Sequence, residues 1–421
     1  MTFCFPQYFT QRTRFLAYTV VAKALTLAGH VLTEHVDDCD AVLFSMCDVM
    51  EYPSLVRMKK FAGHKPLIVG GSYAYHFRSA ILYCDAVWVG ECYEMAECRT
   101  LNELISHPSC YCGGDKLPKA STRIDWEKVP VSQIAPKKAY YWGGQGCKNK
   151  CKFCLTSWTH PHQVNSQARI TAAKKKAADH GLHLMVCANE YSKGDGGTTQ
   201  DMLLKDYLIH PVSRGFVRIG VEFATEETRG RCGKPITDEQ LAKAISKMSK
   251  ENISLRLFHI SGYNTKEEWE EYVERMASVL DRYRPGRLLH LMFNNLQYQN
   301  YTPLYMERKS IDPSRYLDLN DTKRFYDRLR AASPHVLVGA PSPFAHVAAR
   351  MGTELATEKA QVDYWRKLLR TPAAKMNPEK IYRDLFRTGV MDTPALRMDF
   401  RTGQIMEVSQ DGGATPSAGG N

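Results

Sequence analysis

The segment 140–158 contains three cysteines in the spacing C-x3-C-x2-C: Cys147, Cys151 and Cys154. Thiolates placed this close can hold three corners of a cubic iron-sulfur cluster and leave its fourth iron open. The same thiols could bind zinc with His160 or His162 as the fourth ligand, because zinc accepts Cys3His sets. A disulfide with one thiol left over is the third interpretation. Each interpretation requires this loop to close on itself, so the cysteine spacing constrains the fold strongly.

The size and composition of the chain limit the class of protein. At 421 residues it exceeds what one hydrophobic core usually supports, so we expect two or three domains. No apolar run approaches the length of a membrane span, and residues 1–15 lack the charged-then-apolar pattern of a signal peptide. We therefore expect a cytoplasmic protein with no membrane partner and with reduced thiols. The net charge of +11 permits nucleic acid as a partner without requiring it.

Residues 1–104 predict a small α/β domain. A helical pattern over 15–27 ends at the stop signal Ala28-Gly29-His30. Short apolar strands follow at 41–45, 66–71 and 86–91. Buried strands separated by helical segments indicate a doubly wound parallel sheet. Gly70-Gly71, at one strand end, either turn the chain or face a ligand.

The segment 105–137 is rich in proline, glycine and charge and predicts a linker. After it, strand and helix patterns alternate, which predicts a parallel barrel with its site at the carboxyl ends of the strands. The expected strands are 181–189, 215–222, 253–262 and 287–294. The expected helices are 169–180, 238–251 and 266–281, the second with Thr237 as N-cap and Gln240 completing a capping box.

The cysteine array resembles the defining motif of the radical S-adenosylmethionine (radical SAM) superfamily, with Phe153 as the aromatic residue before the third cysteine. In that family SAM chelates the fourth iron, and its reductive cleavage gives a 5'-deoxyadenosyl radical that abstracts hydrogen from a substrate carbon. The resemblance implies a [4Fe-4S] cluster on Cys147, Cys151 and Cys154, with SAM as a second cofactor. It also implies a one-electron reductant as a partner, such as flavodoxin or ferredoxin.

The segment Ile219–Gln240 resembles a second motif of the family, a strand ending in G-V-E followed by a charged helix and G-K-P. By analogy, Glu222 faces the ribose or amino group of SAM, and Arg229 or Arg231 meets its carboxylate. A cationic amino group favours a nearby carboxylate, and a carboxylate favours a guanidinium fork. Each arginine could instead lie on a solvated helix face.

Two later segments resemble further family features. Phe258–Trp269 is similar to the strand end whose backbone binds adenine, which implies contacts from Ile260 and Gly262; an ordinary strand-to-helix turn is the alternative. Asn294–Met306 resembles the segment that caps the barrel mouth. Its tyrosines could stack on a planar substrate or pack the lid: Tyr298, Tyr301 and Tyr305. Asn189, Glu190 and Asp195 follow a strand end and could contact substrate or SAM, or be ordinary solvent-facing loop residues. Pro341–Leu355 resembles a family helix.

Residues 1–104 resemble the cobalamin-binding-like domain that precedes the barrel in one branch of the superfamily. The D-x-H-x-x-G motif, whose histidine ligates cobalt in typical members, is absent, so cobalamin is possible without being predicted. Cys4 and Cys47 lie where methylthiotransferases place two ligands of an auxiliary cluster, but the third position is Ser72. We therefore favour buried core thiols, and methylthiotransferase activity is disfavoured.

Together these features predict an α/β protein: a cobalamin-binding-like sheet domain (1–104), a linker (105–137), a partial (β/α)6 radical SAM barrel (138–310), a helical C-terminal extension (311–408) and a flexible tail (409–421). The leading hypothesis is modification of a nucleic-acid base or base-linked side chain, as in DNA hypermodification. The alternative is a methylase or rearrangement enzyme acting on a peptide or small metabolite, with or without cobalamin. A non-enzymatic alternative is a metal-binding nucleic-acid module.

Overall fold

The computed structural model describes the chain over these residues: 1–6, 14–188, 199–212, 215–310, 312–341, 358–371, 380, 383–384, 394–408 and 414–415. The polar residues Asn189, Glu190 and Asp195, the segment 342–355 and most of the predicted tail lie outside these ranges. Within them, no helix combines the length and apolar character that a membrane span needs.

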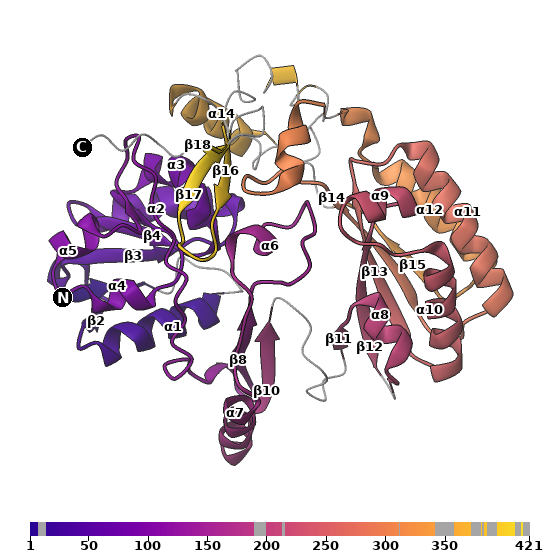
Figure 1. The fold of residues 1–421 in the computed structure, drawn as a ribbon, viewed down its shortest axis with the longest axis horizontal. Coiled ribbons are helices and arrows are strands. Elements are labelled where there is room, and N and C mark those ends of the chain that lie inside the picture. The colour runs from indigo at the N-terminus through magenta and orange to yellow at the C-terminus, as the bar shows by residue number, and fades with distance from the viewer. Residues whose placement is uncertain are drawn as a thin grey trace.

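The N-terminal part of the chain forms a six-stranded sheet in the order β2-β1-β3-β4-β5-β6 (Figure 1). Its strands are β1 (Thr2–Cys4), β2 (Val31–Thr33), β3 (Ala41–Ser45), β4 (Leu67–Gly70), β5 (Ala86–Trp88) and β6 (Cys110–Tyr111). Its helices are α1 (Arg14–Leu27), α2 (Tyr52–Ala62), α3 (Phe77–Ala80), α4 (Tyr93–Glu97) and α5 (Leu101–Ser106). The first five strands are parallel and β6 is antiparallel to β5, so the predicted parallel sheet is confirmed.

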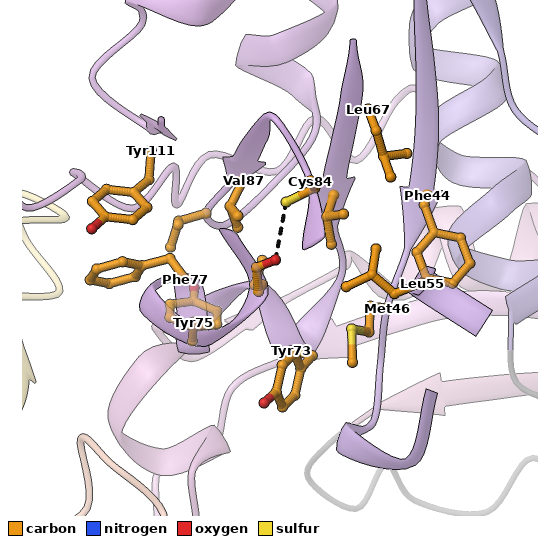
Figure 2. Close-up of a cluster of buried hydrophobic side chains, with 14 of the residues drawn as sticks. Phe44, Met46, Leu55, Leu67, Tyr73, Tyr75, Phe77, Cys84, Val87 and Tyr111 are labelled. Carbon is orange, nitrogen blue, oxygen red and sulfur yellow. Dashed lines mark hydrogen bonds between the residues drawn. The ribbon is translucent and has the colours of Figure 1, made fainter. Parts of the chain in front are cut away.

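This sheet is packed on both faces, as its continuous apolar strands require. Val20 and Leu25 of α1 cover one face. Leu55 of α2 covers the other, where it packs with Phe44 and Leu67 (Figure 2). Buried cysteines take part in this packing: Cys4, Cys39, Cys84, Cys92 and Cys98. They act as small apolar side chains, in agreement with the predicted core thiols.

A second series of parallel strands divides between two sheets. In the smaller, β8 (Lys138–Gln145) pairs parallel with β10 (His183–Ala188) and antiparallel with β7 and β9. In the larger, five parallel strands follow the order β11-β12-β13-β14-β15. The remaining bounds are β7 (Ser132–Ala135), β9 (Gln163–Val164), β11 (Thr199–Asp201), β12 (Phe216–Glu222), β13 (Ser254–Ser261), β14 (Leu289–Asn295) and β15 (Val336–Gly339). All four predicted strands are present, and the sheet continues through β15 past residue 310.

Helices connect these strands and cover the outer face of the larger sheet (Figure 1). Their bounds are α6 (Thr156–Thr159), α7 (Gln167–Asp179), α8 (Leu204–Ile209), α9 (Glu226–Arg231), α10 (Asp238–Glu251), α11 (Lys266–Tyr283) and α12 (Leu319–Ala332). The predicted capping box of Thr237 and Gln240 starts α10. Along β12, Val217, Ile219 and Val221 are buried beneath the helices, so the alternate residues face inward.

The C-terminal part returns to the N-terminal sheet domain (Figure 1). Helix α14 (Glu358–Arg370) places Trp365 in the same core as Leu55, and Trp365 stacks on Tyr52 at 4.3 Å between ring centroids. A small antiparallel sheet of β16 (Ala395–Met398), β17 (Ile405–Val408) and β18 (Ala414–Thr415) packs there as well. The sequence predicted a helical extension and not this sheet, because its strands are too short to show a clear period.

Truncating a buried leucine of the N-terminal core tests this packing. Leu67 is fully buried, so Leu67→Ala should lower the free energy of unfolding by about 2–5 kcal/mol. Leu319→Ala removes a side chain that is 71% exposed and should change it by less than about 0.5 kcal/mol. Urea unfolding followed by circular dichroism gives both values. Equal effects of the two substitutions would contradict the packing.

Candidate functional site

A cavity of about 770 Å³ lies between the cysteine loop and the carboxyl ends of β12, β13 and β14. Its volume is that of a small-molecule site, roughly 300–1,000 Å³. Six of the nine residues predicted to bind cofactors line it: Cys147, Cys151, Phe153, Cys154, Glu222 and Ile260. They are far apart in the sequence, and the cavity forms where parallel strands end, as expected for a ligand site in such a fold.

The cysteine loop is held in shape by its own backbone. Gly146 has φ of 70°, and a side chain there would clash with the carbonyls of His160 and Pro161. The Cys154 N–H donates to the Cys151 carbonyl at 3.2 Å. The indole of Trp158 donates to the same carbonyl at 2.9 Å. The loop therefore turns back on itself and presents its three thiols to one cavity.

The structure bears on the zinc and disulfide interpretations of the cysteine loop. None of the thirteen cysteines forms a disulfide, so the loop contains none. In the ranges that the structure covers, no three His, Cys, Asp or Glu side chains are placed to hold a single metal ion. Thiolates on a cubic cluster bind three different irons and so stand farther apart than the ligands of one zinc ion. His160 lines a different cavity from the three cysteines.

Burial raises the pKa of the Cys151 thiol to about 12, although the nearby Lys234 acts in the opposite direction. A bound metal deprotonates a coordinating thiol outright, which removes this obstacle to forming the thiolate. Asn149 also supports the loop, because its amide donates to the Cys147 sulfur at 3.5 Å. Occupancy by a metal cluster would therefore stabilise this loop in its present shape.

Glu222 sits at the end of β12 in a strained conformation. Its φ of 74° is rare for a residue with a side chain, and the β12–β13 register shifts at the same point. Glu222 accepts from the ammonium of Lys234 at 2.6 Å, and Lys234 also donates to the Gly220 carbonyl at 3.0 Å. A side chain at Gly220 would clash with both partners, so the glycine makes room for the ion pair.

Lys234 is a site residue that the sequence analysis did not identify. Burial by itself lowers its pKa, but Glu222, Cys151 and Cys154 outweigh burial, so its pKa is raised. The ammonium therefore stays charged between one carboxylate and the loop thiols. The G-K-P part of the motif was the available signal, since this lysine falls in a segment that also resembles the family.

The contacts of Arg229 do not fit the predicted contact with the SAM carboxylate. Its guanidinium is completely buried, outside the cavity lining. It donates to three carbonyls and pairs with a carboxylate: Ile236 at 2.7 Å, Phe223 at 3.1 Å, Ala224 at 3.2 Å, and Asp238. The arginine thus ties the end of β12 to the start of α10. Its charge and donors are used inside the protein, which sequence alone could not reveal.

Arg231 is also not among the residues that line the cavity. Its guanidinium instead contacts Tyr263 through both a hydrogen bond and a cation–π interaction. Among the described residues, Arg218, an inward-facing residue of β12, is the arginine that lines the cavity. It precedes Glu222 by four residues, or about 13 Å along a strand. The sequence could have identified Arg218, because inward-facing and buried residues alternate along β12.

Of the two residues predicted to contact adenine through their backbone, Ile260 lines the cavity and Gly262 does not. Ile260 lines the cavity from the end of β13. Gly262 has φ of 102°, but the ring of Tyr316 covers the space beside it, and its N–H donates to the Arg315 carbonyl at 3.1 Å. The glycine is therefore explained by close packing against Tyr316, and its N–H is already used.

The tyrosines of the lid are packed inside the protein. Tyr298, Tyr301 and Tyr305 are at most 6% exposed, and none is among the residues that line the cavity. Tyr301 donates to the Tyr75 carbonyl at 2.9 Å, so it joins the lid to the N-terminal domain. Of the two interpretations given for these tyrosines, the structure favours lid packing over stacking on a substrate.

A second cavity, of about 420 Å³, lies at the carboxyl ends of β3, β4 and β5 and extends to β8 and α6. This is where a doubly wound sheet binds ligands. Gly70 and Gly71 both line it, but a side chain at Gly71 would clash with the backbone of Met46. Gly71 therefore allows a close backbone approach and a turn at the cavity wall, which explains the glycine without a ligand.

The role of Arg229 can be tested by two matched substitutions. Arg229→Leu leaves three buried carbonyls without a donor and should lower the free energy of unfolding by about 3–5 kcal/mol. Arg231→Leu, at an exposed position, should cost less than about 1 kcal/mol. Urea unfolding of both variants is the measurement. Unchanged stability of Arg229→Leu together with weaker SAM binding would instead support the original prediction.

Solved structures share this fold. One is TsrM from Kitasatospora setae, a radical S-adenosylmethionine methyltransferase with tryptophan and a SAM analogue bound, at 11% identity and a TM-score of 0.51, covering 73% of this chain and 75% of that one. Another is OxsB, a cobalamin-dependent S-adenosylmethionine radical enzyme with aqua-cobalamin and S-adenosylmethionine bound, at 11% identity and a TM-score of 0.52, covering 93% and 78%.

One curated protein is similar in sequence over 180 residues, at 24% identity: the tRNA-2-methylthio-N(6)-dimethylallyladenosine synthase of Paracoccus denitrificans. The similarity spans 38% of this chain and 38% of that protein. No protein-family model matches the chain. The structural likeness confirms the predicted fold class: the chain shares its fold with the radical SAM enzymes TsrM and OxsB.

Proposed function

We propose that the chain is a radical SAM enzyme that binds a [4Fe-4S] cluster and SAM in the 770 Å³ cavity. The observation that carries the proposal is the meeting of the three-cysteine loop with the Glu222–Lys234 pair and the β13 strand end in one cavity. When bound, the two cofactors supply a hydrogen-abstracting radical. A one-electron reductant such as flavodoxin or ferredoxin is part of this proposal.

The protein side chains have separate tasks in this scheme. Cys147, Cys151 and Cys154 hold the cluster and leave one iron for SAM. Glu222, fixed by Lys234, accepts a hydrogen bond from the SAM amino or ribose group. Ile260 lines the cavity at the strand end where the adenine is expected. Because Arg229 is used inside the fold, these residues, and not Arg229, determine where SAM lies.

For the substrate, we keep the proposal of a nucleic-acid base or base-linked side chain. Its support is the net charge of +11 and the similarity over 180 residues to an enzyme named for a modified adenosine of tRNA. The argument from the lid tyrosines no longer applies, because they are buried. Methylthio transfer is disfavoured, since Ser72 replaces the third auxiliary cysteine and its hydroxyl donates to the Cys47 carbonyl at 3.0 Å.

The second candidate is methylation or rearrangement of a small metabolite. The cavity of about 420 Å³ beside the first favours it, because that volume suits a small molecule. An oligonucleotide and its free nucleoside, offered separately as substrates, distinguish the candidates. Turnover of the nucleoside alone would favour the metabolite.

Replacing one cluster ligand tests the chemistry. After anaerobic reconstitution with iron and sulfide, the chain should release 5'-deoxyadenosine from SAM when dithionite is added. Cys151→Ser should lose bound iron and at least 100-fold of this release, because a hydroxyl is a poor iron ligand. Cys112→Ser, at an exposed cysteine far along the chain from the loop, is the control and should behave as the original protein. Release that survives Cys151→Ser would contradict the proposal.

Replacing Glu222 tests the SAM site separately. Glu222→Gln removes a charge-assisted hydrogen bond, worth about 1.5–3 kcal/mol, so the Kd for SAM should rise roughly 10- to 100-fold. Equilibrium dialysis with the reconstituted protein measures it, and iron content should stay constant. Glu239→Gln changes an exposed glutamate on α10 and provides the matched control. An unchanged Kd for Glu222→Gln would exclude this contact.

A further inference from the structure

The 420 Å³ cavity contains a buried polar group without a partner. Gln145, at the end of β8, is 7% exposed and lines the cavity. Its amide nitrogen donates to a carboxylate oxygen of Glu91, which follows β5. Among the residues that the structure describes, its amide oxygen, Oε1, has no hydrogen-bond partner. A buried acceptor left in this state costs about 1–3 kcal/mol, so the pair is built to receive a donor.

Glu91 adds a second acceptor at the same place. One of its carboxylate oxygens accepts from Gln145, and no hydrogen bond to the other, Oε2, is found among the described residues. Burial raises the pKa of Glu91 to about 7, while the hydrogen bond from Gln145 acts against this effect. The carboxylate is therefore ionised in mildly alkaline solution. The lining contains no lysine or arginine among the residues that the structure describes.

His160 provides a third acceptor. The Thr159 hydroxyl donates its one proton to the Leu155 carbonyl at 2.9 Å, so it must accept from Nδ1 of His160 at 2.8 Å. Burial lowers the pKa of His160 to about 4, so the ring is neutral with its proton on Nδ1. Its other nitrogen, Nε2, is then an acceptor. His160 lines the same cavity as Glu91 and Gln145.

The rest of the wall is apolar and suits a flat ligand. Val20, Phe44, Ile68, Trp88 and Trp142 all line the cavity. Aromatic and branched side chains favour planar rings, while a few polar groups fix the orientation. The ligand that matches this combination has a planar apolar body and an edge with several N–H donors.

The two cavities adjoin. Ser72, after β4, and Thr156, at the start of α6, line both of them. A ligand in the smaller cavity therefore lies next to the space between the cysteine loop and Glu222. A molecule bound there is in position to be the substrate of the larger cavity.

We propose that the smaller cavity binds the substrate, a planar nitrogen heterocycle with two adjacent N–H donors, through Glu91 and Gln145. This inference rests on the proposed function, which places the reactive site in the adjoining cavity. A 2-amino-substituted ring of the kind found in guanine has such an edge, and a carboxylate can accept from both donors together.

The same atoms do not fit the nucleotide tail of cobalamin. The benzimidazole of that tail is alkylated on one nitrogen, so its other nitrogen is an acceptor; with Glu91 ionised, it would face the acceptors of Glu91 and Gln145. Like acceptors placed together in a buried site lose their hydrogen bonds to water without replacement. The poor fit of the cobalamin tail is consistent with the absence of the D-x-H-x-x-G motif. No step of the proposal uses cobalamin.

The test compares two ring probes by isothermal titration calorimetry at pH 8, with the reconstituted protein. The first is 2-aminobenzimidazole, which has adjacent donors; the second is 1-methylbenzimidazole, which has none and mimics the cobalamin tail. The first should bind at least tenfold more tightly. Glu91→Gln should remove at least tenfold of that affinity, and Ala17→Phe, which adds a ring to the cavity wall from α1, should abolish binding.

Glu97→Gln is the matched control, because this glutamate of the same domain is exposed and paired with Arg123. The Glu97→Gln variant should bind 2-aminobenzimidazole with the same affinity as the unsubstituted protein. Thermal unfolding checks that each variant is folded; Glu91→Gln removes a buried charge and should not lower stability. Equal or tighter binding of 1-methylbenzimidazole, or no effect of Glu91→Gln, would overturn the inference.

The release of 5'-deoxyadenosine is measured on the same samples. Release without binding of 2-aminobenzimidazole would overturn the substrate inference and leave the radical chemistry standing. Binding that depends on Glu91, without any release, would support the cavity and refute the proposed function. The two proposals can therefore fail separately.

Discussion

The backbone of Lys152, in the middle of the cysteine loop, connects parts of the chain that share no strand pairing. Its N–H donates to the Cys232 carbonyl at 3.0 Å, and its carbonyl accepts from the Leu304 N–H at 3.0 Å. One bond reaches the end of α9 and the other the lid. Gly233 packs against the loop too, with no room for a side chain beside Lys150. These contacts hold three thiols opposite Glu222, and the cavity exists because of them.

Backbone strain and a buried ion pair occur at the same residue, Glu222 at the end of β12. Glu222 adopts a backbone conformation that costs free energy, and the structure retains it because Lys234 and the empty space at Gly220 compensate. The buried Arg229 stabilises the turn that follows by binding its carbonyls. The site is thus supported by residues that never reach the cavity. This separation explains why one arginine of the motif has a structural task while a lysine contributes to the site.

The two adjoining cavities differ in polarity. The larger contains the cationic groups of Arg218 and Lys234, the carboxylate of Glu222 and the thiols of the loop. The smaller contains acceptors on an apolar wall. SAM carries both a cation and a carboxylate and suits the first, whereas an uncharged ring with donors suits the second. Under the two proposals, cofactor and substrate are therefore separated by the character of the groups that each strand end provides.

The sequence by itself determined the local elements and identified the three thiols that meet at the larger cavity. Strand and helix periods, the Thr237 cap and the cysteine spacing depend on neighbours in the chain, so they could be predicted from sequence. The tertiary structure decided which polar side chains face a ligand: it buried Arg229, covered Gly262 with Tyr316, paired Glu222 with Lys234 and joined Gln145 to Glu91. Those outcomes depend on contacts between residues distant in sequence, where burial and partner determine whether a charge or a donor remains available.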